Sequence, residues 1–447
     1  LELVLNGGIW DPLFQMVVNA GIHGLAILLL LFGLRKELPQ GALIPLVLFS
    51  LILGVPFGWE NTLAGFQSQF YFLLLFGVLS IGWLTTALPL SGRWWLGFAA
   101  MAASGFSVAS GFLVGLAVAA GYLFQMLADR KADRRKCIGM GILLVYAALA
   151  YGFTPAVEAH APLKAAGFHD FSLSILKALA FPFTTTPYLA IFTQLPVLAC
   201  AWRGMANHRA GRNPGLPWFL SVATLWLYLN ATATAYGRGA GGAAPASRYM
   251  DTLALLNVVN FAAGLHLVSM FPGRRMKFAL AGWSIILLAG GLGIYGHSLR
   301  HVIHNEARLR RIQEANVRRF LEDFDRECME RLPYYSIPYP TAPRLIDLLE
   351  NETIRDFLPT PLRRPVPADP SRQSGFTADG APAPLEPDVH GHVWGSFGAQ
   401  GSAEIGSMSR EYHPSQRDGF LEIPVAGQPF EEGMNFQIQD MEGRPLR

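Results

Sequence analysis

The sequence predicts a mainly α-helical protein, a polytopic bundle of about nine or ten membrane spans followed by a polar extramembrane tail. The first 296 residues carry only 27 charged side chains, 18 Lys/Arg and 9 Asp/Glu, whereas soluble domains are about 25% charged. Apolar runs of 18 or more residues recur throughout this region. The remaining residues hold 17 basic and 23 acidic side chains. A simple soluble enzyme is therefore excluded, and the net charge of +3 does not favour a nucleic-acid partner.

Nine apolar runs predict the spans in order. They lie at 13–34, 39–57, 67–88, 94–127, 137–154, 172–202, 216–236, 251–271 and 278–298. The run 94–127 exceeds the roughly 20 residues of one crossing. It is broken by the small, polar segment Ser104–Gly111, which leaves two alternatives, two complete helices or two half-helices. The run 172–202 contains three prolines (Pro182, Pro187 and Pro196), and prolines in a span favour kinks beside a cavity.

Basic residues in the short loops predict the orientation. One alternating assignment collects 14 of them on a single side, with the densest group at Asp129–Lys136. The opposite loops hold only Lys164, Arg238 and Arg248. Because cytoplasmic loops are enriched in Lys and Arg, we expect the basic side to be cytoplasmic. In a bacterium, this places the protein in the inner membrane with its C-terminal tail in the periplasm.

The polar tail divides into three predicted parts after the transmembrane domain 1–298. Residues 299–358 predict amphipathic helices, with a stripe near Phe320 and a second helix capped by Thr341. Residues 359–387 are Pro-rich and predict a linker. Residues 388–447 alternate apolar and polar side chains, which predicts a β-rich, jelly-roll-like domain. We expect this domain to be incomplete, and we also expect further sequence before Leu1.

Two carboxylates are candidates for catalysis at the outer face. Glu60 stands near Trp59, Asn61, Gln67 and Gln69, and a carboxylate among aromatic and amide groups can act as a base or bind sugar hydroxyls. The alternative is an interfacial cap inside an aromatic belt.

The second carboxylate is Asp11, in the sequence GGIWDPLF. Asp followed by Pro is also a common helix start, and this capping interpretation is favoured over catalysis.

Two arginines lie against the charge bias, in a loop rich in Gly and Ala. Arg238 and Arg248 can each bind phosphate oxygens through a planar guanidinium, and Tyr249 can pack against lipid or sugar. The alternative is that both arginines extend toward lipid headgroups or pair with Asp251.

Histidines give weaker candidates. His160 and His169 share one outer loop with Glu158, so they are candidate ligands for substrate, although a solvated loop is the default. His297 and His301 lie one helical turn apart, but no complete ligand set for a metal is visible. We therefore predict no metal ligands.

The segments WENTLAGFQSQFYFLLLF, SVASGFLVGL and PASRYMD are similar to those of an uncharacterised bacterial branch of polytopic membrane proteins. Together with the polar outer loops and external tail, they resemble the GT-C superfamily of integral-membrane glycosyltransferases across most of residues 1–300. The resemblance implies a sugar donor linked to polyprenyl phosphate and an acidic base in the first outer loop. That base would be Asp11 or a residue upstream.

The leading hypothesis is an integral-membrane glycosyltransferase that works at the periplasmic face. It would transfer a sugar from a polyprenyl-phosphate donor to a glycan, lipid or protein acceptor. Arginines or a divalent cation would neutralise the leaving phosphate. Two alternatives remain open: a transporter or flippase of a lipid-linked glycan or anion, and a non-catalytic envelope protein that binds polysaccharide.

Overall fold

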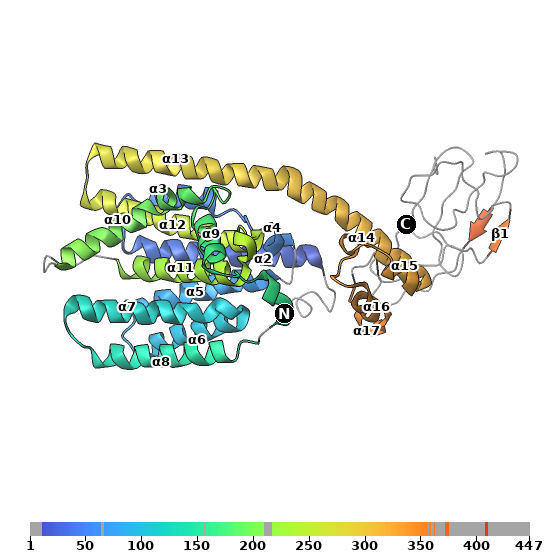
Figure 1. Cartoon of the computed structure of the whole chain (residues 1–447), viewed down its shortest axis with the longest axis horizontal. Coiled ribbons are helices and arrows are strands. Elements are labelled where there is room, and N and C mark those ends of the chain that lie inside the picture. The colour runs from blue at the N-terminus through green and yellow to red at the C-terminus, as the bar shows by residue number, and fades with distance from the viewer. Residues whose placement is uncertain are drawn as a thin grey trace, which may run out of the picture. The chain divides into compact units, whose positions relative to one another are not determined.

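The chain forms two compact units, of which the larger comprises Pro12–His304. The second unit contains the chain from Asn305 onward. The computed structural model describes residues 11–63, 67–155, 157–209, 217–355, 357–358, 362, 372–374 and 407–409. Helices dominate the described residues of both units (Figure 1).

The larger unit is a bundle of long apolar helices. Within the described residues, seven helices are long and apolar enough to cross a membrane, so the protein is a multi-pass membrane protein. Five further helices of the described bundle, α3, α4, α6, α9 and α11, are not among the seven. The helices are α2 (Pro12–Arg35), α3 (Leu43–Leu53), α4 (Trp59–Leu63), α5 (Ser68–Thr86), α6 (Gly92–Ser107), α7 (Leu113–Asp129), α8 (Arg134–Gly152), α9 (Phe168–Leu179), α10 (Ala190–Arg209), α11 (Trp218–Arg238), α12 (Ser247–Met270) and α13 (Arg274–His297).

The surface of the bundle is apolar in the way that a lipid environment requires. Large side chains such as Leu28, Ile44, Val145 and Ile285 are more than half exposed. A water-soluble protein rarely exposes so many apolar groups together, whereas lipid tails accept them. The bundle therefore has apolar side chains both inside and outside, with its polar groups gathered at particular points between the helices.

Basic residues gather at one end of the bundle, here named the basic end. The α7–α8 and α12–α13 turns both lie there (Figure 1). They contain the run Asp129–Lys136 and the group Arg274, Arg275 and Lys277. At the connection after α2, Glu37 accepts hydrogen bonds from the backbone N–H groups at the start of α11. Burial raises the pKa of Glu37, although these N–H groups act in the opposite direction.

The break at Ser104–Gly111 reverses the chain, so the run 94–127 forms two antiparallel helices, α6 and α7. Near their far ends, Trp94 Nε1 donates to the Tyr122 hydroxyl at 2.9 Å, and this hydroxyl donates to Leu84 O at 2.6 Å. Near the break, a side chain at Gly111 would collide with the backbone of Ser104. The two-helix alternative is thus the observed one. The 3-10 helix η2 (Ala109–Phe112) makes the turn.

The run 172–202 is divided between α9 and α10 by a non-helical segment that contains η4 (Pro187–Leu189). Helix-breaking prolines free backbone carbonyls, which must find donors within a membrane. Leu179 O accepts from Thr193 Oγ1 at 2.6 Å and from Gln194 Nε2 at 2.8 Å. Phe181 O accepts from Asn257 Nδ2 of α12 at 2.9 Å. Polar side chains of two neighbouring helices therefore stabilise the interruption.

The second unit is a small helical domain with its own core. Its helices are α14 (His304–Asp323), α15 (Arg326–Glu330), α16 (Ala342–Glu350) and α17 (Glu352–Arg355). Phe320, at the centre of the predicted stripe, is buried, as is Met329 of α15, whereas Ile312 and Phe324 are exposed. Thr341 precedes α16 without forming the expected side-chain cap.

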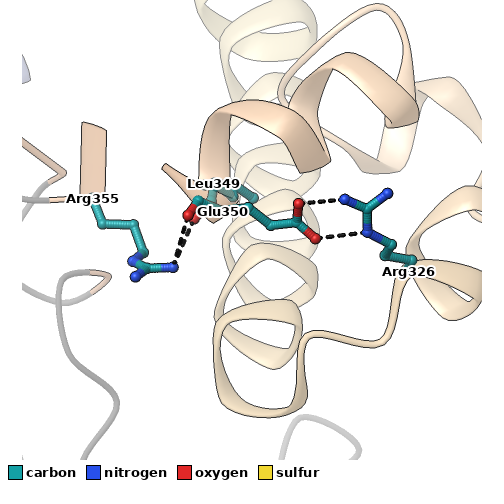
Figure 2. Close-up of polar contacts among 4 residues, drawn as sticks. All are labelled: Arg326, Leu349, Glu350 and Arg355. Atoms are coloured by element: carbon teal, nitrogen blue, oxygen red, sulfur yellow. Dashed lines mark hydrogen bonds and ion pairs between the residues drawn. The ribbon is translucent and has the colours of Figure 1, made fainter. Parts of the chain in front are cut away.

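Arginine contacts join the short helices of this unit. Figure 2 shows Arg326 of α15 binding both carboxylate oxygens of Glu350, the last residue of α16. Arg355 of α17 donates to the backbone carbonyls of Leu349 and Glu350 at 3.2 and 3.4 Å. These bonds satisfy carbonyls that the end of α16 leaves without helical partners.

The predicted β-rich domain is not supported in the described residues. Two three-residue strands, β1 (Arg372–Ser374) and β2 (Ser407–Ser409), pair antiparallel. β1 lies inside the segment predicted as a linker, 359–387. The alternating segments 421–425 and 434–438 lie outside the described residues.

Candidate functional site

Helix α4 is attached to the first turn of α12 by its carboxylate, Glu60. Glu60 Oε2 accepts a hydrogen bond from Ser247 Oγ at 2.5 Å and another from Arg248 N at 3.1 Å. The first N–H groups of a helix lack internal partners and carry partial positive charge, so a carboxylate is stabilised there. Glu60 therefore caps the N-terminus of a helix almost 190 residues away along the chain.

A buried carboxylate, Asp251, strengthens the same junction. Its Oδ1 accepts from Gly58 N at 2.8 Å, and its Oδ2 accepts from Asn61 Nδ2 at 3.1 Å. Asn61 Nδ2 also donates to Arg248 O at 2.8 Å. Asp251 is 2% exposed and Asn61 is fully buried. We name the five residues Gly58, Glu60, Asn61, Ser247 and Asp251 the α4–α12 clamp.

The clamp bears on two sequence-based expectations. Asn61, a candidate substrate ligand, is fully buried and does not line the groove, and its amide nitrogen donates two hydrogen bonds that join α4 to α12. The suggested ion pair between Arg248 and Asp251 does not form among the described residues. Backbone and amide donors satisfy Asp251 instead.

An open groove of about 550 Å³ lies beside the clamp. Glu60 lines it, so one side chain of the clamp also reaches accessible space. Part of the wall is Thr184, from the non-helical segment between α9 and α10, in accord with the cavity expected from the prolines. The lining residues are Trp59, Glu60, Thr184, Ala246, Ser247, Met250, Gly293, Ile294, His297, Ser298 and Val302.

Arg248 stands in sequence between Ser247 and Met250, which line the groove, but it is not itself a lining residue. Its Nε is buried without a hydrogen-bond partner among the described residues. Its guanidinium carbon lies 5.8 Å from the centre of the Tyr249 ring, and Tyr249 packs edge-on against Phe70. The guanidinium of Arg248 therefore forms no ion pair with a carboxylate of the described residues, and its Nε–H group can still donate a hydrogen bond.

Arg238 occupies a different neighbourhood from Arg248. Its Nη2 lies 3.3 Å from His160 Nε2, which belongs to the 3-10 helix η3 (Glu158–Leu163). Neither residue lines the groove. The structure thus brings together two predicted ligands, Arg238 and His160, but does not show the expected pairing of the two arginines.

The remaining loop histidine, His169, is almost fully exposed and lies 3.6 Å from Asp170. Asp170 is held by backbone donors, Gly241 N at 3.0 Å and Ala166 N at 3.3 Å. These N–H groups lower the pKa of Asp170. The carboxylate thereby connects the start of α9 to η5 (Ala240–Gly242), while the histidine itself faces solvent.

The other predicted residues are peripheral. Gln67 is buried directly before α5, with its Oε1 lacking a partner in the described chain. Gln69 is exposed on α5. Asp11 directly precedes Pro12, the first residue of α2, in accord with the favoured helix-start interpretation.

Sequence reasoning missed a buried polar group behind the clamp. Asn19 and His23 of α2 are 1% and 5% exposed. Asn19 Nδ2 donates to Asn61 O at 3.1 Å, and His23 stacks on Tyr71 with ring centres 4.7 Å apart. Their signal was present, because two polar residues one turn apart inside an apolar span are costly and often functional.

No cluster of three or more His, Cys, Asp or Glu residues is placed to bind a metal within the part of the chain that the structure describes. His297 and His301 lie on neighbouring turns with ring centres 5.0 Å apart, so they are the nearest approach to the suggested histidine site.

Comparison with protein-family models, curated proteins and solved structures finds no match to this chain.

Proposed function

We propose that the groove beside the α4–α12 clamp transfers a sugar from a polyprenyl-phosphate donor to an acceptor hydroxyl. Supporting this is the position of Glu60, a carboxylate that is held by a helix N-terminus yet lines an open groove. Both of these hydrogen bonds fall on Oε2. Oε1 accepts neither of them, and we assign it as the general base.

The proposed reaction is a displacement at the anomeric carbon. Glu60 Oε1 takes the proton of the acceptor hydroxyl. At the same time, the oxygen of that hydroxyl forms a bond to the anomeric carbon. The bond from that carbon to the phosphate oxygen breaks, and the electron pair leaves with polyprenyl phosphate. The departing phosphate gains negative charge, which the guanidinium of Arg248 stabilises. A divalent cation on the phosphate would supply the same stabilisation.

The apolar part of the groove suits the lipid portion of such a donor. Met250, Ile294 and Val302 line it, and prenyl chains are stabilised by apolar contacts. Trp59 supplies an aromatic ring of the kind that stacks against sugars. Arg238 is dropped from the proposed phosphate site because its contact is with His160.

We place this groove at the periplasmic face of a bacterial inner membrane, with the tail on the same side. The argument is the distribution of Lys and Arg over the short loops, which assigns the basic end to the cytoplasm. The acceptor would be an envelope glycan, lipid or protein.

The test is release of polyprenyl phosphate from labelled polyprenyl-phosphate hexoses by the purified chain in proteoliposomes. Loss of a general base lowers rates by about 10²–10⁴-fold, so Glu60→Gln should lower release by at least about 100-fold. The matched control is Glu158→Gln, an exposed carboxylate outside the groove, which should retain wild-type release. Unchanged release by Glu60→Gln would contradict the assignment.

A second candidate, a flippase for the same class of lipid, is favoured by one observation. The interrupted segment between α9 and α10 contributes Thr184 to the groove wall, and interrupted helices are typical of transporter binding sites. The two functions separate in the same proteoliposomes. Movement of intact lipid-linked sugar between leaflets without release of polyprenyl phosphate would support the flippase.

A further inference from the structure

Asp251 presents a problem of charge in a membrane protein. It is 2% exposed, and its carboxylate accepts hydrogen bonds from neutral groups, among them Gly58 N and Asn61 Nδ2. No Lys, Arg or His nitrogen of the described chain lies within 4.0 Å of its carboxylate. A buried carboxylate without a counter-charge is costly. Neutral donors stabilise the carboxylate anion, but they do not neutralise its negative charge.

Two buried amide oxygens near Asp251 accept no hydrogen bond from the described residues. Asn19 Oδ1 and Asn61 Oδ1 have no donor among the described residues, although the two side chains are 1% and 0% exposed. A buried oxygen without a donor normally costs about 1–3 kcal/mol. An amide oxygen and a carboxylate oxygen share one property, a lone pair that a cation accepts.

The orientation of both amides is fixed by their other contacts. Asn61 Nδ2 faces two oxygens, Asp251 Oδ2 and Arg248 O, so a flipped amide would place oxygen against oxygen. Asn19 Nδ2 likewise faces Asn61 O. An amide oxygen lies roughly 2.2 Å from its nitrogen, which keeps Asn61 Oδ1 within about 5.3 Å of Asp251 Oδ2. The hydrogen bond from Asn19 Nδ2 to Asn61 O attaches the second amide to the same junction.

The formal charges of the neighbouring side chains decide which cation charge would balance this group. Glu60 of α4 and Asp251 of α12 are acidic, and Arg248 of α12 is basic. His23 of α2 and Tyr71 of α5 are the other titratable groups packed here, and no nitrogen of His23 lies within 4.0 Å of the Asp251 carboxylate. The sum is one negative charge. A monovalent cation would neutralise it, whereas a divalent ion would leave an excess.

We propose that Asp251, Asn61 and Asn19 bind one small monovalent cation, with sodium as the physiological choice. Sodium accepts carboxylate and amide oxygens without requiring nitrogen or sulfur ligands. By joining α2, α4 and α12, the bound ion would stabilise the clamp. The proposal does not depend on the sugar-transfer reaction, because it concerns the buried side of the clamp and not the groove.

The test measures binding directly on the purified full chain. Equilibrium dialysis with radioactive sodium, at constant ionic strength in choline chloride, should give about one bound ion per chain in the wild type. The same sodium range should raise Tm in a saturable way. Asp251→Asn should abolish the binding, and Asn19→Ala should weaken it by at least about tenfold.

The control is Glu37→Gln, which alters another partly buried carboxylate that accepts backbone N–H bonds. It should leave sodium binding at the wild-type level. If Asp251→Asn does not fold, Asn19→Ala decides, since it removes one oxygen and one hydrogen bond only.

Three outcomes would overturn the proposal. The first is no sodium bound by the wild type. The second is equal stabilisation by sodium and choline, which would indicate ionic strength alone. The third is stabilisation by acid with no sodium uptake, which would assign a proton to Asp251.

Discussion

A methyl group added at Gly58 should disrupt the α4–α12 clamp from within. An ideal Cβ at this position would lie 2.6 Å from Asn61 Nδ2 and closer still to Asp251 Oδ2. Real Cβ atoms essentially never approach within 3.0 Å. Neither neighbour can rotate away cheaply, because Asn61 and Asp251 are fixed by hydrogen bonds to each other and to the backbone of Gly58 and Arg248.

The expected magnitude follows from these contacts. Overpacking a filled interior costs about 1–3 kcal/mol, and losing one hydrogen bond to a buried charge costs about 1.5–3 kcal/mol. Gly58→Ala should therefore destabilise the bundle by roughly 2–5 kcal/mol, since part of the strain relaxes when the bond breaks. Helix propensity offers no offset, because Gly58 precedes α4.

The assay is reversible unfolding of the purified protein by sodium dodecyl sulfate in mixed micelles, followed by tryptophan fluorescence. Gly21→Ala is the matched control. A Cβ at Gly21 of α2 would meet nothing within 4 Å, so this variant should stay within about 1 kcal/mol of the wild type. If Gly58→Ala also falls within about 0.5 kcal/mol of the wild type, the clamp is not packed as described.

Three further predictions test other contacts. Arg248→Lys should lower release of polyprenyl phosphate roughly 100-fold at normal membrane abundance, because lysine keeps the charge but loses the planar fork; wild-type release would leave Arg248 as an interfacial anchor. The pKa of Asp170 is lowered chiefly by Gly241 N–H. Its stabilisation is present above its ordinary value of 3.8 and lost as pH falls through the lower folded value. The protection factor of the Gly241 amide, taken against the intrinsic exchange rate at each pH, should thus fall in acid, and Asp170→Asn should remove the transition. Arg326 lowers the pKa of Glu350 through an exposed ion pair, so salt should reduce amide protection around α16 in the wild type but not in Arg326→Gln.

The apolar spans could be predicted because the lipid-facing and the core-facing sides of a membrane helix both carry apolar side chains. The reversal at Ser104–Gly111 was visible as a polar break. The division of 172–202 into α9 and α10 was less visible. Prolines indicate an interruption, but the donors that stabilise it, Gln194 and Asn257, come from later helices.

Only half of the candidate site could be predicted, because its bonds join residues far apart in sequence. Glu60 was found from its local setting, a carboxylate between aromatic and amide residues. Its partner Ser247 could not be found, because nothing near either residue indicates that α4 packs on α12. Asp251 was assigned to Arg248 on spacing alone, whereas the structure gives it to Gly58 and Asn61.

The central claim is that the groove bearing Glu60 opens on the face opposite the basic loops, outside the cytoplasm. The most direct measurement is a pair of alkaline phosphatase fusions in a bacterial host, since this enzyme is active only after export. A fusion after Lys136 reports the basic end, and a fusion after Leu332 reports the side reached by the chain after α13. We predict an inactive fusion at Lys136 and an active fusion at Leu332. The reverse pattern would place the groove in the cytoplasm and contradict a periplasmic transfer reaction.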